Sequence, residues 1–212
     1  MKFIFKVVIL AVMAAAMLTA CGKANTGNKA ASDKKSTAVP AASQEIDPQL
    51  IANTDKITIT LADGDVIKAE LYPDLAPITV ANFENLVNEH FYDGLIFHRV
   101  ISGFMIQGGG YDVNGNEKAA ASIKGEFAAN GVKNDLKHTK GVLSMARTSV
   151  PDSASSQFFI MHKDSPHLDG QYAAFGKVTE GIEVVDKIAG VQTDSSDKPV
   201  TPVVIQSITM DE

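Results

Sequence analysis

Hydrophobic and polar residues alternate along the chain from about residue 56 in a way that predicts β-structure. Lys56–Leu61 alternates polar and apolar residues with a period of two, and Val66–Leu71 is a second candidate strand. Ala62–Asp65 between them contains the Asp and Gly residues that are typical of a turn. Because successive side chains of a strand point to opposite faces, the three segments together predict a β-hairpin. Six further segments are predicted to be short strands: Ile96–Val100, Phe104–Gln107, Gly141–Ala146, Phe158–Met161, Ala173–Val178 and Val203–Met210.

Two segments instead show the spacing of an amphipathic helix. After Pro77, a residue suited to the first helical position, apolar residues recur at Val80, Phe83, Leu86, Val87 and Phe91. This helix is predicted to stop near Asp93-Gly94, and a second helix is predicted over Gly181–Ala189. Residues 108–140 have little apolar periodicity and are predicted to form long loops. Many short strands and two helices predict a mainly β fold, a closed antiparallel β-barrel capped by helices.

The first twenty residues have the pattern of an export signal. Lys2 and Lys6 precede an uninterrupted apolar run over Val7–Ala16, which Met17–Ala20 extends with a single polar residue. A positive start followed by a short apolar run is the plan of a secretory signal peptide. The run is shorter than the ~18–20 apolar residues that a membrane-spanning helix needs, so an uncleaved anchor is the weaker alternative.

Cys21, the only cysteine of the chain, directly follows this run. The residues Leu18-Thr19-Ala20-Cys21-Gly22 resemble the lipobox of bacterial lipoproteins. The resemblance implies that residues 1–20 are a lipoprotein signal peptide, and that Cys21 becomes the first residue and carries the lipid. The protein would then be exported and anchored by lipid to the bacterial cell membrane. The alternative is an ordinary signal peptide in which the small residues Ala14–Ala16 direct cleavage and Cys21 has no role.

Composition divides the remaining chain into a linker and one folded domain. Residues 21–53, from the lipidated cysteine onward, are rich in Ala, Ser, Thr, Asn and Lys and contain no aromatic residue. Such a segment cannot bury enough apolar surface to offset the entropy of ordering, so it is predicted to be a flexible linker. Residues 54–212 hold 13 Lys and Arg against 22 Asp and Glu, a net charge of −9. An acidic domain argues against a general nucleic-acid partner.

The predicted domain contains several long motifs in a fixed order. They are Phe97–Gly109 (FHRVISGFMIQGG), Gly141–Arg147 (GVLSMAR) and Ser155–Ile160 (SSQFFI), followed by Leu168–Gly170 (LDG) and Phe175–Val178 (FGKV). Together these motifs resemble the cyclophilin family, and the resemblance extends from about Lys56 to the C-terminus. It implies an eight-stranded antiparallel barrel with a helix at each end. It also implies peptidyl-prolyl isomerase activity without a metal or a cofactor.

The resemblance also implies roles for individual residues. Arg99 corresponds to the catalytic arginine of the family. Phe104, Met105, Phe159 and Leu168 correspond to the walls of a proline pocket, and Gln107 and Gln157 to hydrogen-bonding residues. Ala146 and Arg147 correspond to a rail for the substrate backbone, with His98 beside it. His167 and Tyr172 complete the substrate-binding set. Proline-containing peptides and, behind an export signal, unfolded exported proteins are the expected partners. A monomer is expected.

The sequence departs from the family pattern at four positions. His167 stands where many eukaryotic members have a tryptophan that contributes to binding cyclosporin, Tyr172 where many have histidine, Arg147 where asparagine is common, and Ser102 where proline is common. An imidazole buries less apolar area than an indole, so we expect weak inhibition by cyclosporin. The other three departures are expected to leave substrate binding intact.

Other functions remain as alternatives. The main one is a peptide-binding chaperone module with little or no turnover. A hydrolase is a remote possibility, because no Gly-x-Ser-x-Gly motif accompanies the available Ser, His and Asp residues. The group His162, Asp164, His167 and Asp169 matches no known spacing of metal ligands, so no metal is expected.

Overall fold

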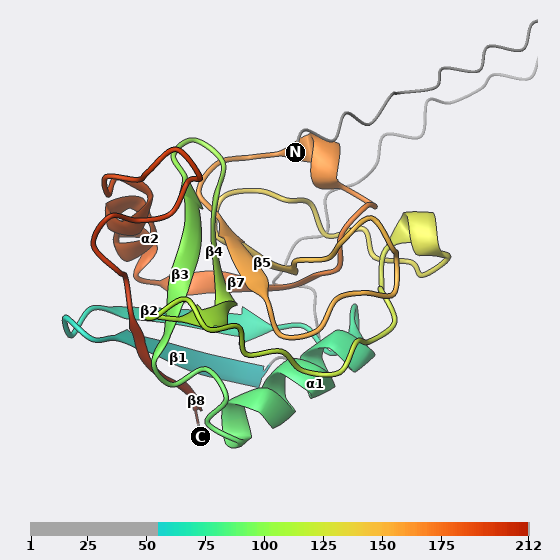
Figure 1. Ribbon diagram of the computed structural model, residues 1–212. Coiled ribbons are helices and arrows are strands. Elements are labelled where there is room, and N and C mark those ends of the chain that lie inside the picture. The colour runs from blue at the N-terminus through green and yellow to red at the C-terminus, as the bar shows by residue number, and fades with distance from the viewer. Residues whose placement is uncertain (1–54, 212) are drawn as a thin grey trace, which may run out of the picture. The chain divides into compact units, whose positions relative to one another are not determined.

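The computed structural model describes residues 55–211, which form a barrel of antiparallel strands (Figure 1). The predicted signal peptide, Cys21 and the linker lie outside the described residues. The eight strands are hydrogen-bonded in the order β3-β4-β6-β5-β7-β2-β1-β8. Their bounds are β1 Asp55–Leu61, β2 Val66–Leu71, β3 Leu95–Ile101, β4 Met105–Asp112, β5 Val142–Met145, β6 Phe158–Met161, β7 Ala174–Glu180 and β8 Ile205–Met210. The helices are α1 Pro77–Asn88 and α2 Ile182–Ala189, with short 3₁₀ helices η2 Ala128–Asn130 and η3 Pro166–Leu168.

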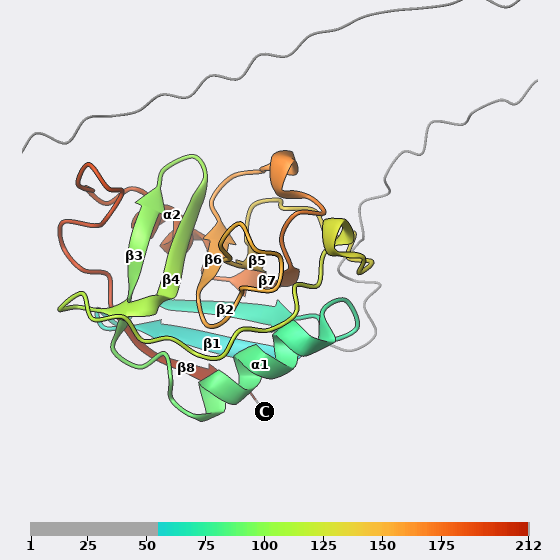
Figure 2. The same ribbon diagram turned by 45° about the vertical axis from the view of Figure 1, so that its right-hand side comes forward.

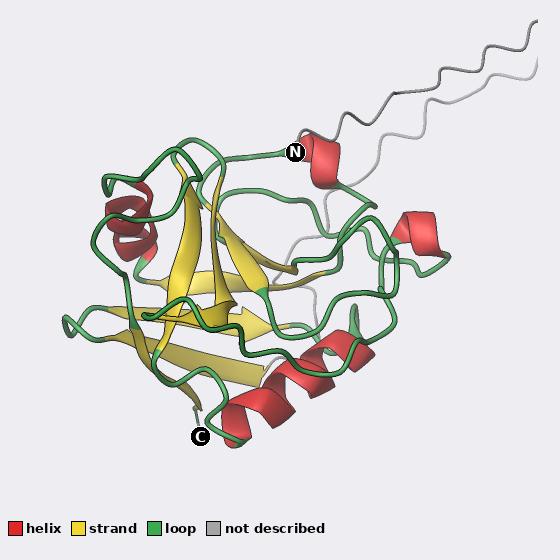
Figure 3. Ribbon diagram, viewed as in Figure 1, coloured by secondary structure: helices red, strands yellow, loops and turns green. Residues whose placement is uncertain are grey.

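The barrel is nearly closed where its first and last strands in the sheet order meet. An isolated antiparallel bridge joins Ile96 of β3 to Val204, just before β8. Close to it, the Phe97 N–H donates to the Val203 carbonyl (3.0 Å) and the Gly94 N–H to the Ile205 carbonyl (2.9 Å). The two α-helices lie on different sides of the barrel, α1 along β1 and β8 and α2 near β3 (Figures 2 and 3). The predicted mainly β barrel with two helices is therefore confirmed.

Alternation along the strands separates two clusters of buried side chains. In β6, Phe158 and Ile160 pack in the main core, whereas Phe159 and Met161 belong to a smaller cluster on the other face. Aromatic rings fill the main core: Phe83 of α1 packs edge-on against Phe158 with ring centroids 5.4 Å apart. The smaller cluster lies beside the cavity that is described below. One short strand thus contributes to the stability of the barrel and to the wall of a site.

Helix α1 takes its N-terminal cap from a distant loop. Its local sequence offers no side-chain cap and no acidic residue in the first turn. Instead the Glu126 carboxylate, only 2 % exposed, accepts hydrogen bonds from the backbone N–H groups of Ile78 (3.0 Å) and Thr79 (2.7 Å). The N–H groups at the start of a helix carry partial positive charge, which favours an acidic side chain in this position. The contact ties the long loop between β4 and β5 to the helix.

The predicted end of α1 near Asp93-Gly94 is wrong, because the helix ends at Asn88. His90 has a left-handed φ of 53°. The N–H groups of His90 and Phe91 donate to the carbonyls of Val87 (3.0 Å) and Leu86 (2.9 Å). This is the hydrogen-bond pattern of a Schellman motif, which usually has glycine at the left-handed position. A histidine in that place gives no sequence signal, and the first glycine after the helix is Gly94.

The prediction of loops over residues 108–140 is wrong for the first five residues. Gly108, Gly109 and Gly110 continue β4 to Asp112. Glycines have no side chains with which to show alternation, so the strand was invisible in the pattern. A Cβ at Gly108 would lie 3.0 Å from the ring of Phe97, so the glycine lets β4 approach that ring closely. The rest of the segment contains only η2 and isolated bridges among named elements.

Candidate active site

A cavity of about 160 Å³ opens on the face formed by β3, β4, β5, β6 and η3. Nine of the twelve residues that the cyclophilin resemblance selected line it: Arg99, Phe104, Met105, Gln107, Ala146, Arg147, Phe159, Leu168 and Tyr172. The other three, His98, Gln157 and His167, do not line the cavity but contact or neighbour residues that do. Residues far apart in the sequence are thus gathered around one hollow.

Pairing of β3 with β4 positions the polar side of the cavity. Arg99 of β3 lies opposite Gln107 of β4. The Gln107 Nε2 donates to the Gln157 Oε1 (2.9 Å), which holds the two amides together. On its other side, the Arg99 Nε lies 3.4 Å from the Oδ2 of Asp197. A fixed positive charge therefore borders the cavity, with amide groups next to it.

Aromatic and aliphatic side chains form the apolar side of the cavity. Phe159 of β6 meets the Tyr172 ring edge-on, with centroids 5.9 Å apart. Phe104, in the turn between β3 and β4, stacks on the exposed ring of His167 with centroids 5.7 Å apart. Met105 and Leu168 are buried in the same cluster as Phe159. These side chains make an apolar wall suited to a small hydrophobic ring.

Arg147 lines the cavity, and several contacts hold its side chain. Its guanidinium lies over the rings of Tyr172 (4.6 Å to the centroid) and Phe127 (4.9 Å). The Nε and Nη2 atoms donate to the Gln171 carbonyl at 3.0 and 2.9 Å. The neighbouring Ala146 N–H donates to the Gln157 carbonyl (2.9 Å). The cyclophilin resemblance implies that Arg147 belongs to a rail for the substrate backbone, and in the structure its side chain is also held by these contacts.

A buried polar network supports Phe159 from behind. The His138 ring, which stacks on Phe159 (6.2 Å), makes contacts from Nδ1 to the Asp169 Oδ1 (3.1 Å) and from Nε2 to the Ser144 Oγ (3.0 Å). Burial lowers the pKa of His138, and the Asp169 carboxylate opposes that shift. The three residues are arranged like a hydrolase triad, but Ser144 is 0 % exposed. A nucleophile must reach its substrate, so a triad role is excluded, and the network instead packs against Phe159 through the His138 ring.

His98 lies beside Arg99 in β3 but does not line the cavity. Its ring meets the Tyr111 ring edge-on with centroids 4.8 Å apart. Burial lowers the pKa of His98, and the positive charge of Arg99 contributes in the same direction. The neutral form is therefore favoured next to Arg99.

Sequence reasoning missed several residues of this neighbourhood. Phe127 and Asp197 contact cavity residues although neither belongs to a motif. His138 lies in a segment that was predicted to be loop, and its partner Ser144 was hidden inside a strand motif. The only available signal was the Asp-Ser-Ser-Asp turn at 194–197, which by itself indicates a loop.

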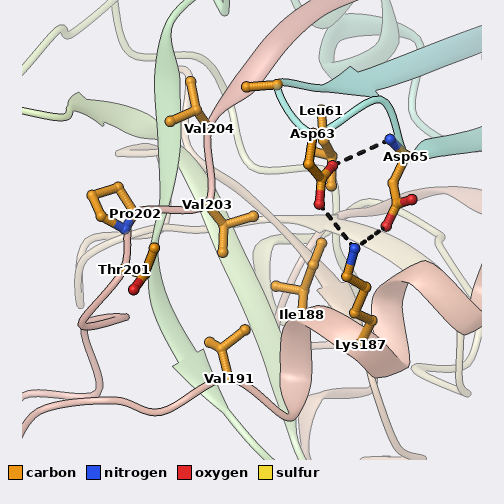
Figure 4. Close-up of a pocket in the computed structure, with 11 residues that line it drawn as sticks. Leu61, Asp63, Asp65, Lys187, Ile188, Val191, Thr201, Pro202, Val203 and Val204 are labelled. Carbon is orange, nitrogen blue, oxygen red and sulfur yellow. Dashed lines mark hydrogen bonds and ion pairs between the residues drawn. The ribbon is translucent and has the colours of Figure 1, made fainter.

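A second cavity, of about 410 Å³, lies away from these residues between the β1–β2 turn, α2 and residues 201–204. Figure 4 shows the Lys187 Nζ at its edge, between the carboxylates of Asp63 (2.9 Å) and Asp65 (2.6 Å). None of the predicted site residues lines it. Within residues 55–211 no cluster of three or more His, Cys, Asp or Glu side chains could hold a metal ion. No helix of that part of the chain is long and apolar enough to cross a membrane.

Comparison with known proteins places this arrangement in a family. The family model described as cyclophilin type peptidyl-prolyl cis-trans isomerase/CLD matches residues 56–210. A peptidyl-prolyl cis-trans isomerase from Acinetobacter baylyi is 53% identical over 152 residues, covering 67% of this chain and 78% of the relative. Peptidyl-prolyl cis-trans isomerase B from Bacillus subtilis is 51% identical over 123 residues, covering 58% of this chain and 82% of the relative.

Solved structures agree with the sequence comparison. The crystal structure of a cyclophilin-type isomerase from Cryptosporidium parvum matches with a TM-score of 0.65 at 30% identity, covering 76% of this chain and 99% of that one. A crystal structure of the same protein in the presence of the dipeptide Ala-Pro matches with a TM-score of 0.63 at 31% identity, covering 74% and 99%. The chain therefore belongs to the cyclophilin-type peptidyl-prolyl cis-trans isomerases, enzymes that interconvert the cis and trans forms of X–Pro peptide bonds.

Proposed function

We propose that Arg99 and the cavity beside it catalyse this rotation, and that the protein does so for unfolded exported proteins from a lipid anchor at Cys21. The observation that carries the catalytic part is the position of a guanidinium at the edge of a cavity that also has a wall of aromatic and aliphatic side chains. An apolar wall can hold a proline ring, while the cation acts on the bond next to it.

The chemistry needs no nucleophile. Resonance gives the peptide C–N bond partial double-bond character, and the barrier to rotation is ~18–20 kcal/mol. Rotation requires the lone pair of the prolyl nitrogen to leave conjugation, which makes that nitrogen a better hydrogen-bond acceptor. A guanidinium donor aimed at it stabilises the twisted state more than the planar one. Interactions that are stronger in the transition state than in the ground state are the ones that raise the rate.

The other residues would hold the substrate around this donor. Phe104, Met105, Phe159 and Leu168 would enclose the proline ring. Gln107, fixed by its hydrogen bond to Gln157, can engage a neighbouring carbonyl of the peptide. Arginine stays protonated at all usable pH, so we expect a nearly flat rate profile from about pH 6 to 9. The Cryptosporidium parvum relative was crystallised in the presence of Ala-Pro, which supports a short X–Pro segment as the substrate class.

The location is inferred from the first twenty-one residues. A charged start, an apolar run and a lipobox-like end at Cys21 favour export and lipidation. Several acyl chains hold a protein at a membrane far better than one, so a lipidated cysteine would give a lasting anchor. Residues 22–53 would then be a flexible spacer, and the domain from Thr54 would act as a monomer near the membrane. Incorporation of labelled fatty acid into the wild type but not into Cys21→Ser tests the anchor.

The catalytic proposal is tested by exchange NMR on a short Ala-Pro peptide with catalytic amounts of enzyme. Wild type should accelerate cis–trans exchange. A charged hydrogen bond contributes about 1.5–3 kcal/mol, so Arg99→Ala should lower kcat/KM about ten- to a hundredfold. Full activity in a folded Arg99→Ala variant would remove Arg99 from the mechanism.

A peptide-binding chaperone with little turnover is the second candidate. The apolar wall of the cavity favours it, because such a surface can grip unfolded segments without rotating any bond. Suppression of aggregation that survives Arg99→Ala, together with no acceleration of exchange by wild type, would select this function.

A further inference from the structure

A tight turn between α2 and β8 reaches the candidate catalytic arginine. Thr193 and Pro199 form an antiparallel bridge at its base. The Asp194 carboxylate accepts hydrogen bonds from the backbone N–H groups of Ser196 (2.8 Å) and Lys198 (3.0 Å). The backbone N–H of Asp194 donates to the Lys198 carbonyl (2.8 Å). These bonds cross the turn from both sides. The backbone at its tip is therefore held in one conformation.

Asp197 occupies the position of the turn that glycine fits best. Its φ of 63° is left-handed, a conformation that glycine adopts freely and that Asp tolerates less well. Its carbonyl accepts a hydrogen bond from the Val100 N–H (2.8 Å), the residue next to Arg99 in β3. The backbone of Asp197 is thus anchored to the strand that carries Arg99, at a site where the backbone alone would favour a different residue.

The side chain of Asp197 forms an ion pair with Arg99, which explains why an aspartate occupies this position. Its Oδ2 lies 3.4 Å from the Arg99 Nε. Within residues 55–211, no other ion pair and no hydrogen bond engages the Arg99 side chain. Asp197 does not line the cavity, whereas Arg99 does. The carboxylate therefore contacts the Nε side of the guanidinium, and no contact within the described residues occupies the two terminal amino groups.

We propose that Asp197 is a positioning residue, which holds the Nε edge of Arg99 so that the terminal amino groups face the X–Pro bond. The inference rests on the proposed catalytic role of Arg99. A long arginine side chain has many rotamers, and a fixed partner reduces the entropy lost when the guanidinium is ordered. Because Asp197 acts through Arg99 and does not line the cavity, its removal should lower kcat and leave KM nearly unchanged.

Three variants of the full-length protein distinguish the effect of the Asp197 carboxylate from the effect of the turn conformation. Asp197→Gly suits the left-handed backbone and removes the carboxylate, Asp197→Asn keeps the shape without the charge, and Glu180→Gln is the matched control. Glu180 forms an exposed ion pair with Lys68 (3.0 Å) outside the cavity, so this control makes the same change in charge. Ion pairs between half-exposed side chains are weak, so we expect both Asp197 variants to lose about two- to fivefold in kcat. Glu180→Gln should match wild type.

Two further readouts distinguish positioning from a structural role. Salt screens exposed charges, so raising NaCl from about 0.02 to 0.5 M should lower wild-type activity toward that of Asp197→Asn, whose activity should change little. The Arg99 Nε–H resonance in NMR spectra should shift in both Asp197 variants and stay in place in Glu180→Gln.

An Arg99→Ala arm keeps the two proposals apart. If Arg99→Ala loses activity while both Asp197 variants keep wild-type kcat at low salt, only the positioning role is overturned. If Arg99→Ala keeps full activity, the catalytic proposal itself fails. If Asp197→Asn loses activity and Asp197→Gly does not, the turn and not the carboxylate is responsible, which also overturns the inference.

Discussion

Gly110 offers a way to disturb the polar side of the cavity without touching any residue that lines it. A Cβ at this position would lie 2.6 Å from Cγ, Cδ and Nε2 of Gln157. Real Cβ atoms do not approach neighbours so closely, and Gly110 does not have the left-handed φ that would exclude alanine. The Gln157 side chain must therefore move in Gly110→Ala. Its movement breaks the 2.9 Å hydrogen bond from Gln107.

The expected magnitude follows from that hydrogen bond. A hydrogen bond between neutral groups contributes about 1 kcal/mol, which corresponds to about a fivefold loss of kcat/KM. The free energy of unfolding of Gly110→Ala should differ from wild type by less than about 1 kcal/mol. The flexible Gln157 side chain can move aside, and replacing glycine reduces the conformational freedom of the unfolded chain. Gly176→Ala is the contrasting case. Its Cβ would lie 2.5 Å from the backbone carbonyl oxygen of Glu70, which cannot move aside, so it should destabilise by about 1–3 kcal/mol.

Exchange NMR on an Ala-Pro peptide measures the activity, and urea titration measures the free energy of unfolding. Gln157→Ala should lose activity to a similar extent. The double variant Gly110→Ala, Gln157→Ala should be no worse than Gln157→Ala alone, since the clash disappears with the side chain. Wild-type activity in a Gly110→Ala variant whose Gln157 amide resonances have moved would refute the coupling. Additive losses in the double variant would do the same.

Three more predictions concern charge and pH. Burial lowers the pKa of His138 below its ordinary 6.5, so the unfolded chain binds this proton more readily than the folded protein does. The free energy of unfolding should therefore fall as pH drops below 6.5, and NMR should show the ring of His138 still neutral in the folded protein there. Burial raises the pKa of Glu84 to about 7, and a hydrogen bond with Asp55 and the charge of Asp55 act in the same direction. The free energy of unfolding should therefore decrease as pH rises from 4.5 to 7, and urea titrations should show that Glu84→Gln lacks this decrease. Arg147→Asn removes the cation–π contact with Tyr172, so kinetic assays should show a raised KM with little change in kcat, and unfolding about 1 kcal/mol easier; a lowered kcat at unchanged KM would contradict this account.

Much of the barrel could be predicted from local patterns. Alternation over Lys56–Leu61 and Val66–Leu71 reflects strands with one buried face, and the spacing after Pro77 reflects a helix packed on one side. The predicted ends of α1 and β4 were wrong because the residues at those ends are unusual for the positions they occupy. His90 ends α1 in place of a glycine, and the glycines after Gln107 continue β4 without any alternation of side chains.

The sequence by itself also determined the chemical types at the site, because ordered motifs carry Arg99, Gln107 and Phe159 together. Only the tertiary structure decided which residues support them. The Asp197 contact depends on a turn nearly a hundred residues away in the chain folding back onto β3, and the Glu126 cap depends on a long loop reaching α1. Such contacts leave no periodic trace, since each is a single polar side chain whose partner is set by the closure of the barrel. The motifs thus specify a donor beside an apolar pocket, and the fold specifies how that donor is held.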